Sequence, residues 1–177
     1  MKLIQIQPLR ISLILFFLMT GLFAAAHAQD DKAARPSPPA QATANVKGRT
    51  ITIEYGQPSV KGREVWGKLV PYGQVWRAGA NETTAFTTSG DVKVEGKTLP
   101  AGKYAFFVIP SEKEWTIVFN KTIKWGAFSY KEDEDVLRVS VPARKTSAPV
   151  EKLTYTISPR GDVTLAWADR QATFRIN

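Results

Sequence analysis

The chain has no cysteine and a single histidine, His27. Without cysteine there is neither a disulfide framework nor a thiol nucleophile, and lipid attachment to an N-terminal cysteine is excluded. If residues 1–28 are removed, the histidine is lost as well. The rest of the chain then lacks the side chains for Ser-His-Asp and Cys-His catalysis, for zinc sites built from nitrogen and sulfur, and for haem ligation through His or Cys. We therefore expect no cofactor.

Long apolar runs are scarce too. The run at the N-terminus, from Ile11 to Ala26, has 16 residues, whereas a transmembrane helix needs about 20. It follows Lys2 and Arg10, and it ends in an Ala-X-Ala sequence that closes at Ala28. This order is typical of a secretory signal peptide, with an uncleaved membrane anchor as the alternative. We predict a signal peptide at residues 1–28, cleavage after Ala28, and a periplasmic or secreted protein with no stable membrane anchor after cleavage.

Clusters of basic charge are also missing. The net charge of the whole chain is +8, and it falls to +6 without the first 28 residues, because they hold two basic residues and no acidic one. The lysines and arginines are scattered singly along the chain. Together with export, this distribution predicts a basic envelope protein with no nucleic-acid partner.

Residues 29–45, QDDKAARPSPPAQATAN, are rich in proline, alanine and polar residues and show no periodicity. This composition predicts a flexible leader. The remaining residues, 46–177, are enough for a single domain.

Short segments that alternate apolar and polar residues dominate that domain. TITIEY, KLTYTIS, DVTLAW, ATFRIN and DVLRVSV each place their apolar side chains on one face, as half-buried strands do. KYAFFVIP is apolar on both faces, which predicts a covered central strand in a hairpin with EWTIVFN, and DVKVEGKTLP predicts a second hairpin. No segment has a convincing helical period. The fold class expected is all-β, an antiparallel β-sandwich of about eight or nine strands, with a β-barrel or jelly roll as the alternative.

The segments ITIEYGQPSVKGREVWGKLVPYGQVWRAGANETT, LPAGKYAFFVIP, WTIVFNK, WGAFSY and DVLRVSV follow one another in this order. Together they resemble the bacterial domain-of-unknown-function family 2911, over roughly residues 37 to 176. The resemblance implies an exported single-domain protein of Gram-negative bacteria, and it implies no activity because none is assigned to the family. Phe128 departs from the family pattern, in which we would expect a tyrosine.

The segment from Ser59 to Thr84 does not alternate, yet it combines aromatic, cationic and amide side chains with several glycines. Long structured loops of this kind are often functional. An aromatic ring would stack on a sugar, Arg77 would bind a carboxylate or phosphate, and Asn81 would bind hydroxyls. The candidate ligand-binding residues here are Lys61, Arg63, Tyr72, Trp76, Arg77, Asn81, Glu82 and Thr83.

The same residues also fit a structural brace. Arg77 would then pair with Glu82, and Asn81 would bind backbone groups from a left-handed turn. We favour the brace for Arg77 with Glu82, and the ligand site for Trp76, Asn81 and Thr83.

A second loop, NKTIKWGAFSY, contributes Trp125 and Tyr130 as further candidates. If this loop meets the segment VWRAGANETT, the two would line one aromatic, basic cleft. The acidic run that follows, from Glu132 to Asp135, suits a solvated turn best. Calcium binding by Asp133 and Asp135 is a weaker alternative, as is catalysis by paired carboxylates.

These features predict an exported, non-enzymatic β-sandwich that binds a small polar or anionic ligand, such as a glycan or cell-wall fragment, or a protein partner of the envelope. Two alternatives stay open. One is a histidine-free hydrolase that uses paired Asp or Glu, and the other is a structural envelope module.

Overall fold

The computed structural model describes residues 31–177. The predicted signal peptide and its cleavage after Ala28 lie outside the described residues. Ala33–Asn177 forms a compact unit of its own, with a large apolar core and a smaller apolar cluster, so this part has what it needs to fold without the residues before it. Within residues 31–177, no helix has the length and apolar content that a membrane span requires.

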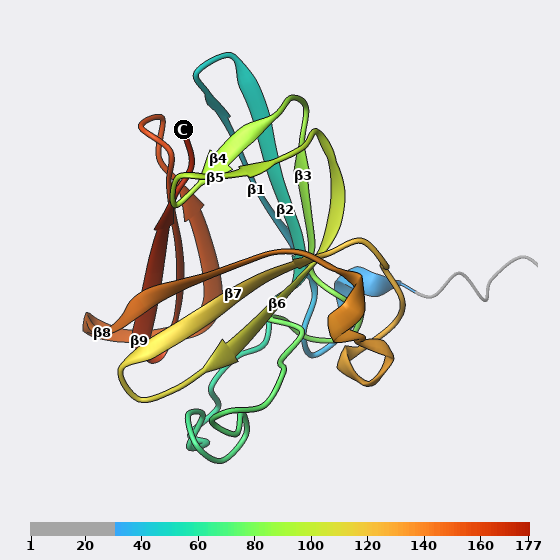
Figure 1. Cartoon of the computed structure of the whole chain (residues 1–177). Helices are drawn as coiled ribbons and strands as arrows, with labels where there is room; N and C mark the ends of the chain where they lie inside the picture. Colours follow the sequence, from blue (N-terminus) through green and yellow to red (C-terminus); the bar gives the residue numbers. More distant parts are fainter. Residues whose placement is uncertain (1–30) are drawn as a thin grey trace, which may run out of the picture. The chain divides into compact units, whose positions relative to one another are not determined.

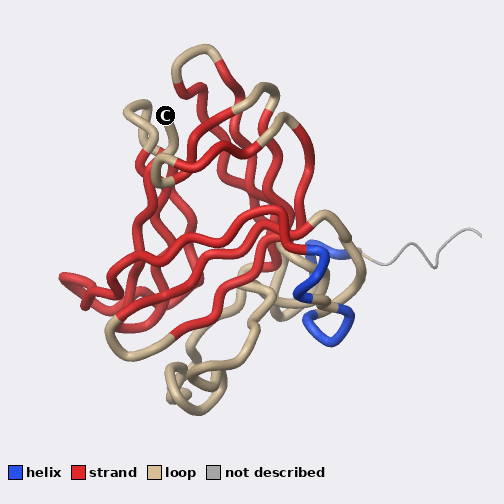
Figure 2. Tube along the Cα trace, viewed as in Figure 1, coloured by secondary structure: helices blue, strands red, loops and turns tan. Residues whose placement is uncertain are grey.

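Nine strands and three short 3-10 helices make up the described chain (Figures 1 and 2). The strands are β1 (Pro39–Val46), β2 (Arg49–Gly56), β3 (Ala85–Thr88), β4 (Val92–Val94), β5 (Lys97–Leu99), β6 (Gly102–Pro110), β7 (Glu114–Asn120), β8 (Asp135–Ile157) and β9 (Asp162–Arg175). The 3-10 helices are η1 (Lys32–Ala34), η2 (Ala127–Ser129) and η3 (Glu132–Glu134).

Seven strands form one antiparallel sheet in the order β1-β2-β3-β6-β7-β8-β9, and β4 pairs with β5 in a small second sheet. The large sheet curls because β8 is 23 residues long and changes partner along its length. Its first part pairs with β7, and the part from Ala143 onward pairs with β9. A bridge between Val94 and Ile176 joins the small sheet to the end of β9. The predicted all-β antiparallel fold is confirmed.

Alternation in the sequence corresponds to burial in the structure. Ile51, Ile53 and Tyr55 of β2 are buried, as are Leu165 and Trp167 of β9. The predicted central strand is β6, which pairs with β7 as expected. One of its faces contributes to the main core, and the other forms a smaller apolar cluster in which Ala105, Phe107 and Val118 are buried. Both faces of β6 are therefore covered.

The predicted leader is wrong over its second half. Residues 39–46 form β1, which pairs with β2 along its whole length, from Pro39 opposite Gly56 to Val46 opposite Arg49. The turn between the two strands has positive φ angles at Lys47 (50°) and Gly48 (81°), as a two-residue hairpin turn of the favoured hand requires. The folded domain therefore begins before residue 46.

Candidate functional site

The long segment between β2 and β3, residues 57–84, has almost no regular structure but is fixed to the sheets by backbone hydrogen bonds. The amide of Val60 donates to the carbonyl of Glu151 on β8 at 2.8 Å. The amides of Gly73 and Trp76 donate to the carbonyls of Pro110 and Val108 of β6, also at 2.8 Å. The segment is therefore anchored to β8 near its start and to β6 further along, and its part from Val60 to Tyr72 forms a wall beside β8 and β9.

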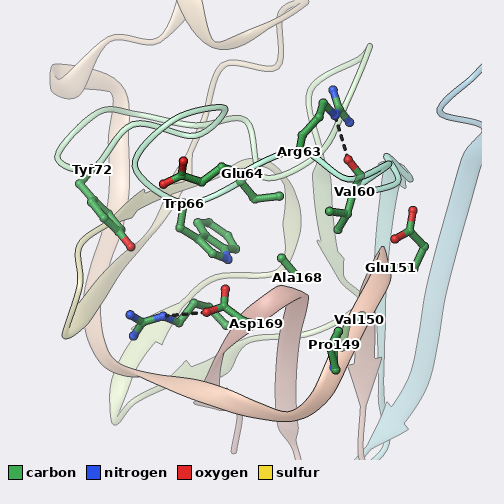
Figure 3. A pocket seen from close by; sticks show the side chains of 12 residues that line it. Val60, Arg63, Glu64, Trp66, Tyr72, Pro149, Val150, Glu151, Ala168 and Asp169 are labelled. Atoms are coloured by element: carbon green, nitrogen blue, oxygen red, sulfur yellow. Dashed lines mark hydrogen bonds and ion pairs between the residues drawn. The ribbon is translucent and has the colours of Figure 1, made fainter.

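A pocket of about 470 Å³ lies between that wall and the two strands (Figure 3). The 57–84 segment contributes one side, β8 contributes a second, and β9 contributes a third. The lining residues are Val60, Arg63, Glu64, Val65, Trp66, Tyr72, Pro149, Val150, Glu151, Ala168, Asp169 and Arg170.

The pocket lies where the pairing of β8 with β9 is interrupted. The register shifts between Lys145 and Val150, and again between Val150 and Thr154. Opposite these breaks, Ala168 has a φ of 53°, in the left-handed region that a residue with a side chain rarely adopts. Bulges and such backbone conformations are enriched beside functional sites, because they redirect side chains that a regular ladder would hold in place.

Trp66 lines the pocket and packs against three further tryptophans. The Trp66 ring lies 4.6 Å from Trp115, 5.7 Å from Trp76 and 6.2 Å from Trp167, measured between ring centroids. Trp76 stacks on Trp167 at 5.9 Å. The indole N–H of Trp66 donates to the carbonyl of Trp167 at 3.2 Å. We call Trp66, Trp76, Trp115 and Trp167 the tryptophan cluster, and through Trp66 it gives the pocket an apolar base.

Side chains of both charges surround this base. Arg63 donates to the carbonyls of Val60 and Ser59, at 3.0 and 2.6 Å, which fixes its guanidinium against its own loop. Arg170 donates to the carbonyl of Glu112 at 3.1 Å. Three carboxylates complete the rim, each on a different element (Figure 3): Glu64 on the loop, Glu151 on β8 and Asp169 on β9.

Two of the three rim carboxylates, those of Glu151 and Asp169, have a partner each, and these partners differ. Glu151 accepts a hydrogen bond from the amide of Lys61 at 3.0 Å, and Asp169 lies 3.9 Å from Arg170. Across residues 31–177, no group of three Asp, Glu, His or Cys side chains is placed to hold a metal ion. The rim is thus suited to hydrogen bonding with a ligand, and its acids do not form one joint centre.

Of the predicted ligand-binding residues, Arg63 and Tyr72 line this pocket. Trp76 lies in the tryptophan cluster beneath it. Lys61 reaches the pocket only through its backbone bond to Glu151. Sequence reasoning did not place Glu64 or Trp66 in the site, although both lie within the loop that it singled out. It also missed Glu151, Asp169 and Arg170, since nothing local in the sequence brings β8 and β9 to this loop.

The predicted brace between Arg77 and Glu82 is wrong. Glu82 accepts two hydrogen bonds from the guanidinium of Arg35, at 3.0 and 3.2 Å. The side chain of Glu82 is also 45% exposed, so it is not a buried carboxylate that depends on one partner. Arg77 lies apart from this pair, and its Nε is buried without a hydrogen-bond partner among the described residues.

Asn81 and Thr83 make internal contacts. Asn81 has a φ of 60°, in the left-handed region expected for a brace, and its amide donates to the carbonyl of Ser37 at 2.8 Å. The buried hydroxyl of Thr83 contacts the carbonyls of Lys124 and Gly126. These two side chains connect the start of the domain and the loop after β7 to the 57–84 segment, away from the pocket.

The loop after β7 therefore meets the segment VWRAGANETT, but it does not extend the pocket. Trp125 projects outward beside Phe128. Tyr130 turns inward, where its ring lies 5.2 Å from that of Phe107. Neither Trp125 nor Tyr130 is part of the pocket lining.

Asp135 is the centre of a closed polar network. It accepts hydrogen bonds from Asn120 at 2.8 Å, from the Tyr130 hydroxyl at 2.7 Å and from Arg138 at 2.5 Å. Burial, followed by the hydrogen bond to Asp135, raises the pKa of Tyr130 to about 12, so the phenol keeps its proton and donates it. The oxygens of Asp135 are thus used by protein donors, while Asp133 is exposed. This geometry gives no support to a calcium site at Asp133 and Asp135.

Comparison with known proteins identifies a family for the chain but gives no activity. No curated protein matches it, and no solved structure matches it. One family model does match, over residues 37–176, and it is described as a protein of unknown function, DUF2911. Since this match spans nearly the whole described domain, the chain belongs to the DUF2911 family.

Proposed function

We propose that the chain is an exported, non-enzymatic binding protein for a small, hydroxyl-rich ligand such as a glycan or a cell-wall fragment. The observation that carries this proposal is the pocket between the 57–84 segment and the break in the β8–β9 pairing. A cavity with an aromatic base and a few polar groups at its rim is the usual form of a small-molecule site.

The charges of the rim favour a neutral polar ligand over an anionic one. Arg63 and Arg170 supply donors, whereas Glu64, Glu151 and Asp169 supply acceptors. A purely anionic ligand would meet three carboxylates, and like charges at close range are unfavourable. Sugar hydroxyls donate and accept at once, so they can satisfy both kinds of group. The apolar face of a sugar ring could lie against Tyr72, above the tryptophan cluster.

A hydrolase that uses paired carboxylates is less well supported. That mechanism needs two carboxyl groups facing one bond, about 5 to 10 Å apart, with one of them held protonated. Here the three acids lie on three different walls (Figure 3), and Asp169 has Arg170 beside it. We therefore favour binding without catalysis.

Ligand binding can be tested by thermal unfolding of Ala33–Asn177 with a panel of glycans and peptidoglycan fragments. A ligand at 100 times its dissociation constant should add about 2.7 kcal/mol to the free energy of unfolding. Glu64→Gln should weaken binding about tenfold, because a hydrogen bond to a charged group contributes roughly 1.5–3 kcal/mol. Tyr72→Leu should weaken it as well.

Asp133→Asn is the matched control, because it removes one exposed carboxylate outside the pocket. It should leave affinity unchanged. If the Glu64→Gln variant and the unmodified domain bind the ligand with equal affinity, the binding site is not this pocket. If no member of the panel stabilises the domain, a structural envelope module would be the better interpretation.

Export is the second part of the proposal, and it rests on the order of basic start, short apolar run and Ala-X-Ala in residues 1–28. The expected result is a mature chain that begins at Gln29. Intact-mass measurement of the protein from the envelope fraction checks this expectation. A mass that includes Met1 would favour the uncleaved anchor instead.

A further inference from the structure

The loop between β7 and β8 carries the most exposed aromatic side chains of the described domain. Trp125 is 59% exposed and Phe128 is 80% exposed, and nearby Ile123 is 43% exposed. The rings of Trp125 and Phe128 lie 5.6 Å apart, so they form one apolar projection. We call residues 121–131 the aromatic loop. Exposed apolar groups gathered in this way are typical of a docking surface.

The conformation of the aromatic loop is fixed from beneath. The hydroxyl of Thr83 contacts the carbonyls of Lys124 and Gly126. The amide side chain of Asn120 donates to the carbonyl of Lys131 at 2.9 Å, and its oxygen accepts from the amide of Thr122, also at 2.9 Å. Polar side chains therefore hold the ends of the loop through Asn120 and its middle through Thr83, while Trp125 and Phe128 remain exposed.

Gly126 is part of this arrangement. Its φ is 76°, and a Cβ at this position would lie 2.6 Å from the ring of Phe128. Only glycine allows both the turn and the position of the ring above it. The inner side of the same loop buries Tyr130 against Phe107. The loop thus separates one aromatic side chain that stabilises the fold from two that do not.

Lysines flank the exposed rings along the loop. Lys121, Lys124 and Lys131 are exposed, and residues 121–131 include no acidic residue. Four acids follow the loop: Glu132 pairs with Arg138 at 2.9 Å, Asp135 pairs with the same arginine, Glu134 is half-buried and Asp133 is exposed. Within residues 121–131 themselves, an aromatic projection flanked by lysines is complementary to a surface that is apolar inside and anionic at its edge.

The aromatic loop also lies where the chain enters the domain. Arg35 pairs with Glu82, and the carbonyl of Ser37 accepts a hydrogen bond from Asn81. Thr83, which follows Glu82 in the chain, contacts the aromatic loop. These contacts hold the aromatic loop beside the residues with which the described domain begins.

We propose that the aromatic loop binds the surface of an anionic lipid bilayer. Trp125 and Phe128 enter the interfacial layer, where aromatic rings partition favourably. The three lysines contact anionic headgroups, which attract basic side chains near a membrane surface. This contact is independent of the pocket, and it would keep the domain at the membrane after the signal peptide is removed.

The test is co-sedimentation of Ala33–Asn177 with vesicles made of equal parts phosphatidylglycerol and phosphatidylethanolamine, compared with vesicles of phosphatidylcholine. The domain should bind the anionic vesicles more strongly, and added salt should weaken that binding because it screens the lysines. The double variant Trp125→Ala with Phe128→Ala should lose about tenfold or more in partition coefficient. Leu69→Ala, which shortens an exposed apolar side chain of the 57–84 segment, should leave the partition coefficient unchanged.

Tryptophan emission gives a second readout that a merely structural role would not move. Trp125 is the one tryptophan of the five outside the tryptophan cluster. Its emission should shift to the blue when anionic vesicles are added, and Trp125→Phe should abolish the shift while keeping most of the binding. If the domain fails to bind anionic vesicles, or if the double variant binds as well as the unmodified domain, the proposal is overturned. A protein partner would then be the better explanation of the exposed rings.

Discussion

Replacement of Trp66 by alanine should lower the free energy of unfolding by about 3–5 kcal/mol, the range found when a buried tryptophan or phenylalanine is removed. Trp66 is only 7% exposed and contacts the other three members of the tryptophan cluster. Its removal would also leave the carbonyl of Trp167 without its indole donor. Because single domains have a total stability of about 5–15 kcal/mol, this loss would be a large fraction of the whole.

Urea unfolding followed by circular dichroism is the measurement, with Trp125→Ala as the matched control. Trp125 is exposed, so its replacement should change stability by no more than about 0.5 kcal/mol. The pair of variants compares the same chemical change in a buried and an exposed position. A loss below about 1 kcal/mol for Trp66→Ala would mean that the cluster can close around the gap and does not form a rigid base for the pocket.

Gly56→Ala should lower the free energy of unfolding strongly as well, by about 3 kcal/mol. Gly56 ends β2, and its carbonyl accepts a hydrogen bond from the amide of Ala80 at 3.2 Å. A Cβ on Gly56 would lie 2.8 Å from the carbonyl carbon of Ala80 and closer still to the oxygen. The atoms that clash belong to the backbone on both sides, so they cannot move aside as the end of a side chain would. The 57–84 segment would therefore have to separate from β2.

The consequence of that separation extends into the core. The carbonyl of Ala78, close to this crossing, accepts hydrogen bonds from the buried hydroxyls of Tyr155 at 2.7 Å and Thr84 at 3.1 Å. Gly90→Ala is the control, because its Cβ would meet only the side chain of Arg49, at 3.3 Å. It should cost less than about 1 kcal/mol. Similar urea midpoints for the two variants would show that the crossing of Gly56 with Ala80 is not tight in solution.

The strands could be predicted because their signal is local. Alternation in β2 places Ile51, Ile53 and Tyr55 on one face within five residues, and a period of two is enough to identify it. β1 was missed because its inward positions include Ala40 and Ala42. Alanines in a segment that also contains proline look the same in a strand as in a flexible leader. What makes β1 a strand is its pairing with β2, which no local pattern reports.

The site was harder to predict because it depends on contacts between distant parts of the chain. Arg63 and Tyr72 could be selected from the character of their loop, but Asp169 and Arg170 reach the pocket only because the β8–β9 register breaks. The pairing expected for Arg77 with Glu82 relied on their closeness in sequence. Left-handed residues at Ala78 and Asn81 turn the chain between them, and Glu82 pairs with Arg35, 47 residues away, instead.

The bridge between Val94 and Ile176 has a consequence for the order in which the fold can form. The amides of Lys93 and Asn177 each donate to the other's carbonyl at 2.9 Å, and Ile176 is fully buried. The hairpins along the chain can form early because their partners are adjacent, whereas this contact closes a loop of more than eighty residues and is slow to form. The small sheet therefore stays without its partner at the end of β9 until the last residues of the described chain are free to pair, so a folding intermediate that lacks this contact should precede the native state.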